Sequence, residues 1–261
     1  MKKMGFIGMG NMAQALAAGF LRSGFLDTES LYAYAPNQDK LYANAKRIGF
    51  TACGSAEALA EACDTLVIAC KPYQLEAVCG ALGEKLAEKA VISVAAGWPY
   101  EKLAAVLPES ARIQFVMPNT PAMVGEGVLL FEERHSLQTE EREQIMQLFS
   151  SVGLVKELPS HLMGIGGALT GCGPAFVDLF LEAYADAAVK YGISRADAYQ
   201  LAAKMVSGSA KLQLETGLHP AVLKDQVCSP AGTTICGVAA LEENGFRHAC
   251  IASIDAVMHK S

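Results

Sequence analysis

The chain has 261 residues, of which 52% are hydrophobic and 18% are charged, and its formal net charge is −6. This length and apolar content allow one large or two modest domains with a sizeable core, and they argue against disorder. The acidic balance, with no run of Lys or Arg longer than two residues, argues against nucleic acid or an anionic membrane surface as a partner.

Eight cysteines are scattered along the chain without C-x-x-C spacing, most of them among apolar or alanine-rich neighbours. We therefore expect reduced core cysteines, no metal site and a cytoplasmic protein. The sequence opens on a strand-like run, Met4 to Ile7, so we expect no signal peptide. The most apolar long stretch, Pro174 to Val189, carries three carboxylates, so we do not expect it to cross a membrane.

Strand-like and helix-like patterns alternate over the first 158 residues. The predicted strands are Lys3–Ile7, Leu31–Ala35, Thr51–Ala52, Thr65–Ala69, Val91–Ala95, Ile113–Met117, Gly127–Phe131 and Val155–Leu158. The predicted helices are Asn11–Ser23, Asp39–Ile48, Ser55–Glu61, Gln74–Leu86, Pro99–Val106 and Thr139–Val152. This alternation predicts an α/β fold in which residues 1–158 form a Rossmann domain, with a parallel sheet covered by helices on both faces.

A glycine-rich turn follows the first predicted strand. The run Gly8-Met9-Gly10-Asn11-Met12-Ala13 matches the pattern G-x-G-x-x-A. The first glycine permits a tight turn, the second lets a pyrophosphate approach the backbone, and the alanine allows close packing of helix on strand. Because the motif lies between a strand and a helix, it predicts a dinucleotide site. The expected contacts are Gly8, Met9, Gly10, Asn11 and Met12.

The end of the second predicted strand bears on which dinucleotide binds. An NAD-preferring site usually has an acidic residue there, which takes the ribose 2′-hydroxyl. Here the chain reads Ala35-Pro36-Asn37, with Asp39 only later and Lys40 nearby. Because this strand end has no carboxylate that could repel a 2′-phosphate, we predict NADP as the cofactor, with NADPH preferred over NADH. Ala35 and Asn37 are the expected contacts. NADH stays open as an alternative.

Three further strand ends are expected to border the cofactor. The fourth is followed by Ala69-Cys70-Lys71-Pro72, in which Lys71 could alternatively be a solvated lysine. The fifth ends in Ala95-Ala96-Gly97, small residues that would let a nicotinamide ring lie close. The sixth ends in the rigid loop Met117-Pro118-Asn119-Thr120-Pro121, for which a plain turn is the alternative.

After Pro159 the pattern changes to helices alone, which places a domain boundary near residues 158–162. The predicted helices are Pro174–Tyr191, Arg195–Thr216, Pro220–Gln226, Thr234–Glu243 and Arg247–Lys260. Ser194 is predicted to cap the second of them, and Gly217 to end it. The long ones are apolar around most of their circumference and must be buried on most sides. One small helical domain offers too little cover. Residues 159–261 are therefore predicted to bind a second copy of the chain, as a dimer or a ring of dimers. The alternative is that they pack wholly against their own Rossmann half.

A short segment of small and hydroxyl residues, Ser229-Pro230-Ala231-Gly232-Thr233-Thr234, runs into one of these predicted helices. Such a loop can present several backbone N–H groups and two hydroxyls at a helix N-terminus, which suits a small anion. The alternative is an ordinary helix start that Thr233 or Thr234 caps.

Four separated elements together resemble the pyrroline-5-carboxylate reductase family, over essentially the whole chain. They are Gly8–Ala13, Lys71-Pro72, Met117–Pro121, and Gly171–Pro174 taken with Ser229–Glu242. The resemblance implies NAD(P)H-dependent reduction of 1-pyrroline-5-carboxylate to L-proline, the last step of proline biosynthesis, by hydride transfer to a cyclic imine. It also implies that Lys71-Pro72 flanks the cofactor's riboses and that Met117–Pro121 lies beside the nicotinamide.

The same resemblance implies a substrate site. The backbone N–H groups of about Gly232 to Thr234 are expected to hold the substrate carboxylate, and the hydroxyl of Thr234 is the expected catalytic group at the imine nitrogen. Since a hydroxyl is a poor proton source, the substrate should bind already protonated or receive its proton from water. The expected substrate contacts are Ser229, Ala231, Gly232, Thr233, Thr234, Gly173 and Asn119, and Asn119 is also expected to contact the cofactor.

The chain departs from the family pattern at two positions. Ala231 stands where the family usually has glycine, and it would be strained if that position needed a positive φ. Cys172 stands where the family usually has serine, so no hydroxyl is available there.

Two other functions fit weaker patterns. A β-hydroxyacid dehydrogenase would use a lysine on a helix of the second half, but Lys190, Lys204 and Lys211 lack the expected Gly-rich and Asn surroundings. A non-catalytic NADP-binding sensor is disfavoured by the intact Thr233-Thr234 pair. None of the five histidines lies in a site motif, and none is assigned to catalysis.

Overall fold

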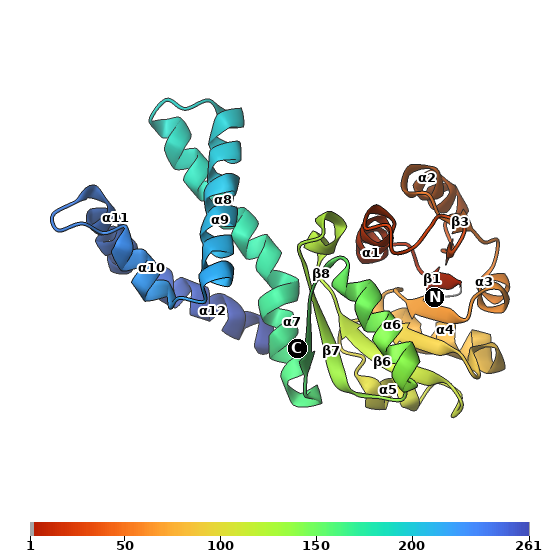
Figure 1. Ribbon diagram of the computed structural model, residues 1–261. Helices are drawn as coiled ribbons and strands as arrows, with labels where there is room; N and C mark the ends of the chain where they lie inside the picture. The colour runs from red at the N-terminus through yellow and green to blue at the C-terminus, as the bar shows by residue number, and fades with distance from the viewer. Residues whose placement is uncertain (1–2, 261) are drawn as a thin grey trace. The chain divides into compact units, whose positions relative to one another are not determined.

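The computed structural model describes residues 3–260 (Figure 1). Two compact units divide the chain: one extends to Pro174 and the other spans Ala175–Lys260. The sequence pattern changes earlier, near residues 158–162. The two positions differ because the helical run that begins at Ser160 continues through the division between the units, without a break, to Lys190. The boundary drawn from the sequence therefore stays a prediction.

An eight-stranded sheet forms the centre of the first unit. Its strands are β1 (Met4–Ile7), β2 (Leu31–Tyr34), β3 (Thr51–Ala52), β4 (Thr65–Ile68), β5 (Ala90–Ser93), β6 (Arg112–Met117), β7 (Gly127–His135) and β8 (Gly153–Leu158). They lie in the order β3-β2-β1-β4-β5-β6-β7-β8. The chain thus runs outward from β1 to β3 and then returns to the other side of β1. The carboxyl ends of β1 and β4 flank this switch point, where doubly wound folds bind their ligands.

Helices and short turns connect the strands of this unit and follow the last of them. They are α1 (Asn11–Arg22), α2 (Gln38–Ile48), α3 (Ala56–Ala62), η1 (Pro72–Gln74), α4 (Leu75–Leu82), η2 (Gly83–Leu86), α5 (Tyr100–Ala104), η3 (Thr120–Val124), α6 (Thr139–Ser150), η4 (Ser160–Leu162), α7 (Met163–Gly167) and η5 (Ala168–Cys172). Alternate residues of the central strands enter two separate apolar clusters: Phe6 and Val67 lie in one, Ile7 and Ile68 in the other. The sheet is therefore covered on both faces, as the alternating pattern predicts.

One predicted feature of the sheet is wrong, because β7 runs antiparallel to β6. The other neighbouring strands are parallel. Between Met117 and Gly127 the connection holds only the short turn η3. A parallel crossover needs about a dozen residues or more, usually with a helix. The connection is too short for that, so the chain turns back on itself.

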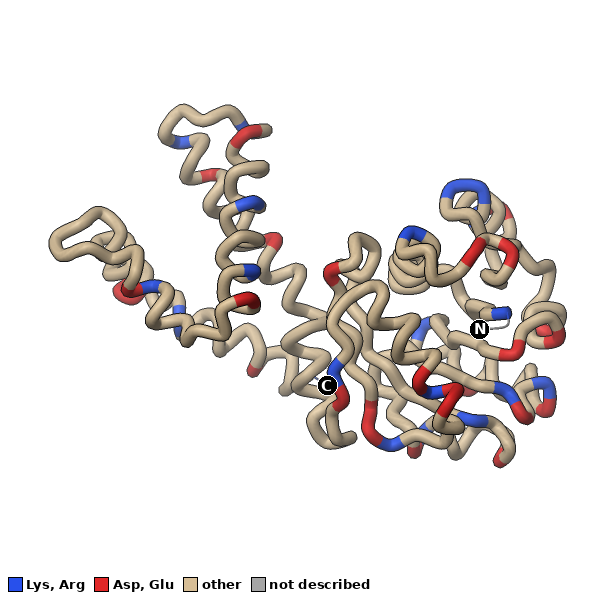
Figure 2. Tube along the Cα trace, viewed as in Figure 1, with Lys and Arg blue, Asp and Glu red and all other residues tan. Residues whose placement is uncertain are grey.

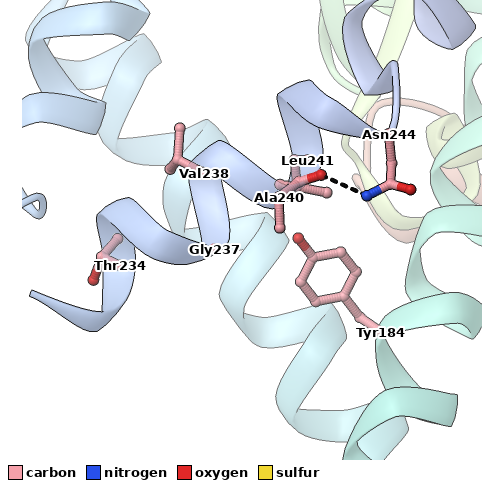
Figure 3. A pocket seen from close by; sticks show the side chains of 7 residues that line it. All are labelled: Tyr184, Thr234, Gly237, Val238, Ala240, Leu241 and Asn244. Carbon is pink, nitrogen blue, oxygen red and sulfur yellow. Dashed lines mark hydrogen bonds between the residues drawn. The ribbon is translucent and has the colours of Figure 1, made fainter.

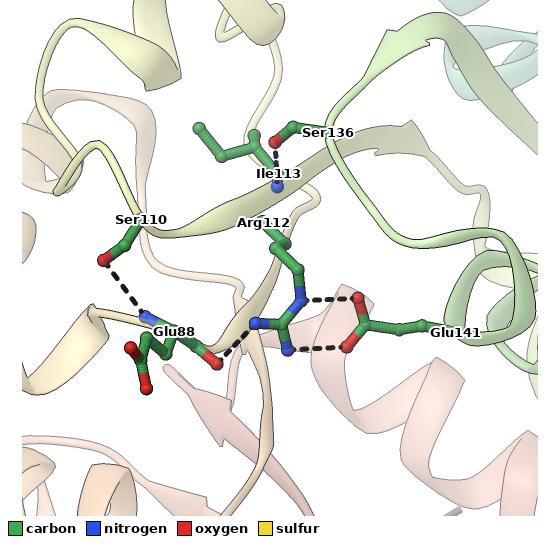
Figure 4. A network of polar contacts seen from close by, with 6 residues as sticks. All are labelled: Glu88, Ser110, Arg112, Ile113, Ser136 and Glu141. Atoms are coloured by element: carbon green, nitrogen blue, oxygen red, sulfur yellow. Dashed lines mark hydrogen bonds and ion pairs between the residues drawn. The ribbon is translucent and has the colours of Figure 1, made fainter.

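A polar network fixes the turn before β5 to the start of β6 and to α6 (Figure 4). Arg112 makes two 2.8 Å contacts with the Glu141 carboxylate, and its Nη1 donates to the carbonyl of Glu88 at 2.6 Å. The paired hydrogen bonds to Glu141 raise the pKa of Arg112. Glu88 has φ +55, which is uncommon for a residue other than glycine. Its backbone is held in that conformation by Arg112 and by the Ser110 hydroxyl, which accepts its N–H.

The thiols differ between the two units. All eight cysteines are free. In the first unit, burial raises the pKa of Cys63 and Cys79 to about 12. Cys236 and Cys250 of the second unit are exposed in the single chain. The prediction that the cysteines lie in the core is therefore wrong for these two. Among residues 3–260, no group of three or more His, Cys, Asp or Glu side chains is arranged to hold a metal ion.

The second unit contains helices alone. They are α8 (Gly173–Lys190), whose first two residues belong to the first unit, α9 (Arg195–Thr216), α10 (Pro220–Gln226), α11 (Thr233–Glu243) and α12 (Phe246–Met258). The Ser194 side chain caps α9 by accepting the N–H of Asp197 at 3.2 Å, and Gly217 ends it with φ +65. Both features were predicted from the sequence.

The second unit buries few of its own side chains. Ala185, Ala198 and Ala202 are its buried residues in the described chain. On α9, Leu201, Met205 and Leu212 are 58%, 45% and 51% exposed. Their spacing of four and seven residues puts them on one face of the helix, where they form an apolar stripe. The stripe lacks cover within its own unit, as expected for a surface that meets a second copy.

The helical run Ser160–Lys190 is long and apolar enough for a membrane span, with a mean hydropathy of 1.3 and 11% of its most apolar window buried. It carries Asp178, Glu182 and Asp186. Figure 2 shows that charges of both signs are mixed over the first unit and are sparse along parts of the second. The same length and composition suit a helix that another protein chain covers.

Candidate active site

The glycine turn after β1 brings two strand ends into close contact. Gly8 has φ +97, and a Cβ there would lie 2.8 Å from backbone atoms of Ala69 and Cys70, so the position accepts only glycine. A Cβ on Gly10 would meet nothing within 4 Å. The helix α1 begins at Asn11 without a side-chain cap, so its first N–H groups are available to a phosphate.

A cavity of about 1120 Å³ opens at this turn, along the carboxyl ends of β1, β2, β4 and β5. A drug-sized ligand usually takes about 300–1,000 Å³, so the cavity can hold an extended dinucleotide. Most of the predicted cofactor contacts line it: Gly8, Met9, Gly10, Asn11, Met12, Ala35, Asn37, Ala69, Cys70, Lys71, Pro72, Ala95 and Ala96.

Two predicted cofactor contacts, Gly97 and Asn119, lie outside this lining. The side chain of Asn119 is buried, and its two polar atoms already have partners. Its Nδ2 donates to the carbonyl of Thr170 at 3.0 Å, and its Oδ1 accepts the N–H of Val128 at 2.8 Å. Asn119 therefore ties the loop after β6 to β7 and to η5, and its contacts with cofactor and substrate stay predictions.

The glycine-rich element around Gly173 is helical. Residues Ala168–Cys172 form the π-helical turn η5, which continues directly into α8 at Gly173. Such turns occur frequently at functional sites. A Cβ on Gly171 or Gly173 would meet nothing within 4 Å, so the backbone is open there. The sequence signal was the pair of glycines before Pro174, but it did not reveal the helix.

Lys40 also lines the cavity, beyond the carboxyl end of β2. It lies in the first turn of α2, where the side chain of Asn37 caps the helix by accepting the N–H of Lys40 at 2.9 Å. Lys40 is exposed, and none of the ion pairs in residues 3–260 involves its ammonium. The sequence placed Lys40 near the site but did not assign it as a contact.

The segment Ser229–Gly232 in the second unit is a tight turn. The N–H of Gly232 donates to the carbonyl of Ser229 at 3.0 Å, and Pro230 precedes Ala231, whose φ is +58. These are the features of a type II turn, whose third position favours glycine. The predicted strain at Ala231 is therefore present, and costs about 1 kcal/mol relative to glycine. A Cβ on Gly232 would lie 2.3 Å from the Ser229 hydroxyl oxygen.

Helix α11 starts directly after this turn without a side-chain cap. Its N-cap residue is Gly232, so neither Thr233 nor Thr234 caps it. The first free N–H groups belong to these two threonines. Between Asp225 and Glu242 the chain has no charged residue. An anion bound here would therefore depend on backbone N–H groups and hydroxyls.

Thr234 borders a hollow of about 550 Å³ within the second unit (Figure 3). Its lining comes from α11, from the residue after that helix and from α8: Tyr184, Thr234, Gly237, Val238, Ala240, Leu241 and Asn244. Figure 3 shows the Tyr184 hydroxyl pointing toward α11. The sequence did not single out Tyr184, because it reads as one of many apolar residues on a buried helix.

The sheet order, the glycine turn and the cavity define a Rossmann-type dinucleotide-binding protein. Over 262 residues the chain is 41% identical to the pyrroline-5-carboxylate reductase of Treponema pallidum, covering 99% of both chains. It belongs to the pyrroline-5-carboxylate reductase family. A second relative, the enzyme of that name from Escherichia coli, is 39% identical, covering 100% of this chain and 97% of that protein.

Family models match both parts of the chain. The model described as pyrroline-5-carboxylate reductase dimerisation matches residues 160–261, and the one described as NADP oxidoreductase, coenzyme F420-dependent, matches residues 3–97. A crystal structure of Plasmodium falciparum pyrroline carboxylate reductase with NADP bound is similar with a TM-score of 0.91 and 32% identity. The match covers 99% of this chain and 96% of that one. The helical half is therefore a dimerisation domain, as its exposed apolar faces predict.

Proposed function

We propose that the protein reduces 1-pyrroline-5-carboxylate to L-proline, the last step of proline biosynthesis, with NADPH as the preferred hydride donor. The observation that carries this proposal is the similarity to pyrroline-5-carboxylate reductases along the whole chain. That similarity takes in both the dinucleotide cavity and the uncapped start of α11.

The first unit binds and orients the cofactor in this proposal. The turn Gly8–Met12 holds the pyrophosphate, Ala35 and Asn37 lie at the adenosine ribose, and the segments 69–72 and 95–96 border the nicotinamide half. Gly97, a further proposed contact, directly follows the second segment. Asn119 lies nearby in the loop after β6. When bound, NADPH supplies the hydride, so the protein contributes positioning and electrostatics.

The second unit holds the substrate in this proposal. The N–H of Gly232 is already used in the turn, so the substrate carboxylate binds at the N–H groups of Thr233 and Thr234. The hydroxyl of Thr234 donates to the imine nitrogen or orients a protonated iminium. A hydroxyl does not deliver the proton itself, which comes with the substrate or from water. Further proposed contacts in this unit are Ser229, Ala231 and Gly232. Gly173, which belongs to the first unit, is also a proposed contact.

The test is oxidation of NADPH by the purified protein in the presence of 1-pyrroline-5-carboxylate, with NADH in parallel. We expect rapid, substrate-dependent oxidation of NADPH and a lower kcat/KM with NADH. Tight NADPH binding without oxidation would contradict the proposed reaction. Equal or better use of NADH would contradict only the proposed cofactor preference.

Replacing Thr234 with alanine is expected to lower kcat by one to two orders of magnitude. This corresponds to the roughly 1.4–2.7 kcal/mol of one catalytic hydrogen bond. Thr234→Ser, which keeps the hydroxyl, should retain most of the activity, and Thr234→Val, which keeps the shape, should not. Steady-state kinetics at saturating NADPH measures the effect. Unchanged turnover in Thr234→Val would remove the hydroxyl from the mechanism.

Replacing Lys40 with methionine is expected to lower kcat/KM for NADPH about tenfold or more, because a charge-assisted contact with the 2′-phosphate is lost. The value for NADH should change less than about twofold, since NADH has no such phosphate. Lys46→Met is the matched control, because Lys46 lies in the last turn of the same helix and does not line the cavity. An equal loss with both cofactors would contradict a role in phosphate recognition.

Self-association through the C-terminal helices follows from the dimerisation model that residues 160–261 match. We propose a dimer as the building unit, alone or in a ring of dimers, in the cytoplasm. Neither a membrane nor a nucleic acid is proposed as a partner. The net charge of −6 and the mixture of basic and acidic residues along the first unit support this proposal.

A further inference from the structure

Two walls of the dinucleotide cavity are the loops that follow the neighbouring strands β4 and β5. Strands β4 and β5 are paired up to Ile68 and Ser93, and the N–H of Val94 donates to the carbonyl of Ile68 at 3.0 Å. Beyond this point the walls are the segments 69–72 and 94–96, both of which line the cavity. Their spacing is no longer set by sheet hydrogen bonds.

Trp98 links these two walls. It is the chain's single tryptophan, and its indole Nε1 donates to the carbonyl of Pro72 at 3.0 Å. That carbonyl also accepts the N–H of Leu75, so the indole bond joins a fixed turn. The ring is half-buried and packs against the apolar cluster on one face of the sheet, as does Cys70. The bond therefore spans from the loop after β5 to the loop after β4.

The loop that carries Trp98 is held firmly at its base. Gly97 has φ +76, and its carbonyl accepts a hydrogen bond from Nζ of Lys102 at 3.0 Å. The N–H of Tyr100 donates at 2.7 Å to Oε2 of Glu132, a fully buried carboxylate on β7. Residues 71–73 of the opposite wall are exposed, as are Ala96 and Gly97. The Trp98–Pro72 bond therefore joins two turns, each held by hydrogen bonds of its own, and fixes the distance between them.

We infer that Trp98 is a positioning residue for the nicotinamide half of the bound cofactor. The inference rests on the proposed function, in which the cavity holds NADPH. With the pyrophosphate at Gly8–Met12 and the adenosine ribose at the end of β2, the other half of the dinucleotide lies over the ends of β4 and β5. The Trp98–Pro72 bond sets the width between the walls there. A displacement of about 1 Å at the reacting ring can cost roughly 100-fold in rate.

The test removes the indole N–H and keeps the shape of the ring. Because the chain has one tryptophan, biosynthetic replacement of tryptophan by β-(3-benzothienyl)alanine changes Trp98 alone. We expect kcat to fall about 5- to 20-fold, less than the roughly 100-fold limit for a full 1 Å displacement. The Kd for NADPH should change less than about threefold, because the pyrophosphate and adenosine contacts stay intact. The nicotinamide fluorescence of bound NADPH should lose much of its enhancement.

Replacement by 5-fluorotryptophan is the matched control, since it keeps the N–H and should restore wild-type kinetics and fluorescence. Trp98→Phe is a genetically encoded second variant. It should likewise lower kcat and leave the Kd for NADPH nearly unchanged. Unchanged kcat and NADPH fluorescence in the benzothienyl protein would overturn the inference. So would a loss of NADPH affinity in proportion to a lowered Tm, which is the result for a purely structural side chain. If the wild-type protein binds NADPH without reducing the imine, the proposed function fails, while the fluorescence measurement still tests Trp98.

Discussion

Replacing Gly10 with alanine should abolish cofactor binding and leave the fold intact. We expect the Kd for NADPH to rise at least about 100-fold, or roughly 2.7 kcal/mol, with a Tm close to that of the wild type. The backbone at Gly10 has φ −76, which alanine adopts freely, and a Cβ there would meet no protein atom within 4 Å. The added methyl group would instead fill the space that the pyrophosphate needs. Calorimetric titration with NADPH and thermal unfolding measure the two quantities.

Two other glycines complete this experiment. Gly54→Ala is the control, because its Cβ also meets nothing within 4 Å but the position does not line the cavity. It should change neither Tm nor Kd appreciably. Gly8→Ala should lower both stability and binding, since its Cβ would collide with the backbone of Ala69 and Cys70. Wild-type affinity in the Gly10→Ala protein would show that the dinucleotide does not pass over this turn.

The double substitution of Leu201 and Leu212 with glutamate should convert the oligomer into monomers without activity. Both residues belong to the apolar stripe of α9, which its own unit leaves exposed. Burying two carboxylates in each copy should weaken association by about 1,000-fold or more, which corresponds to roughly 4 kcal/mol. Sedimentation velocity gives the mass, and circular dichroism gives the helix content that is lost with the partner.

Tyr42→Glu is the matched control for this experiment. Tyr42 is 57% exposed on α2 of the first unit, outside the cavity lining, so a charge there should leave mass and activity unchanged. The Leu201→Glu/Leu212→Glu protein should still bind NADPH, because the cavity lies wholly in the first unit. A dimer of normal mass would show that this stripe is not part of the interface.

Local chemistry explains which features were predictable from the sequence. The glycine turn at Gly8 and the cap at Ser194 each depend on a few adjacent residues, and both have the predicted geometry. For most strands, the predicted ends lie within a few residues of the observed ends. For Ala231, the departure from the motif predicted strain only on the condition of a positive φ, and the structure shows that the condition holds.

Features that depend on distant partners were not predictable. The direction of β7 leaves no trace in its own periodicity, since a strand alternates in the same way whether it runs parallel or antiparallel. The signal lay instead in the short connection between Met117 and Gly127, which has no room for a crossover helix. The π-helical turn η5 is a slip in backbone hydrogen bonding without a sequence signature. The bond from Trp98 to Pro72 joins residues 26 positions apart, and only the pairing of β4 with β5 brings them together.

The uneven distribution of the core has a consequence for how the protein is made. The first unit contains nearly all the fully buried side chains, and it emerges from the ribosome before the helices that follow. It can therefore fold as soon as it is synthesised. The apolar side chains of the second unit are buried mostly by another chain. Completing the fold of this unit is therefore a bimolecular step, whose rate rises with the expression level. Until that encounter, the C-terminal helices are the natural target of chaperones and proteases.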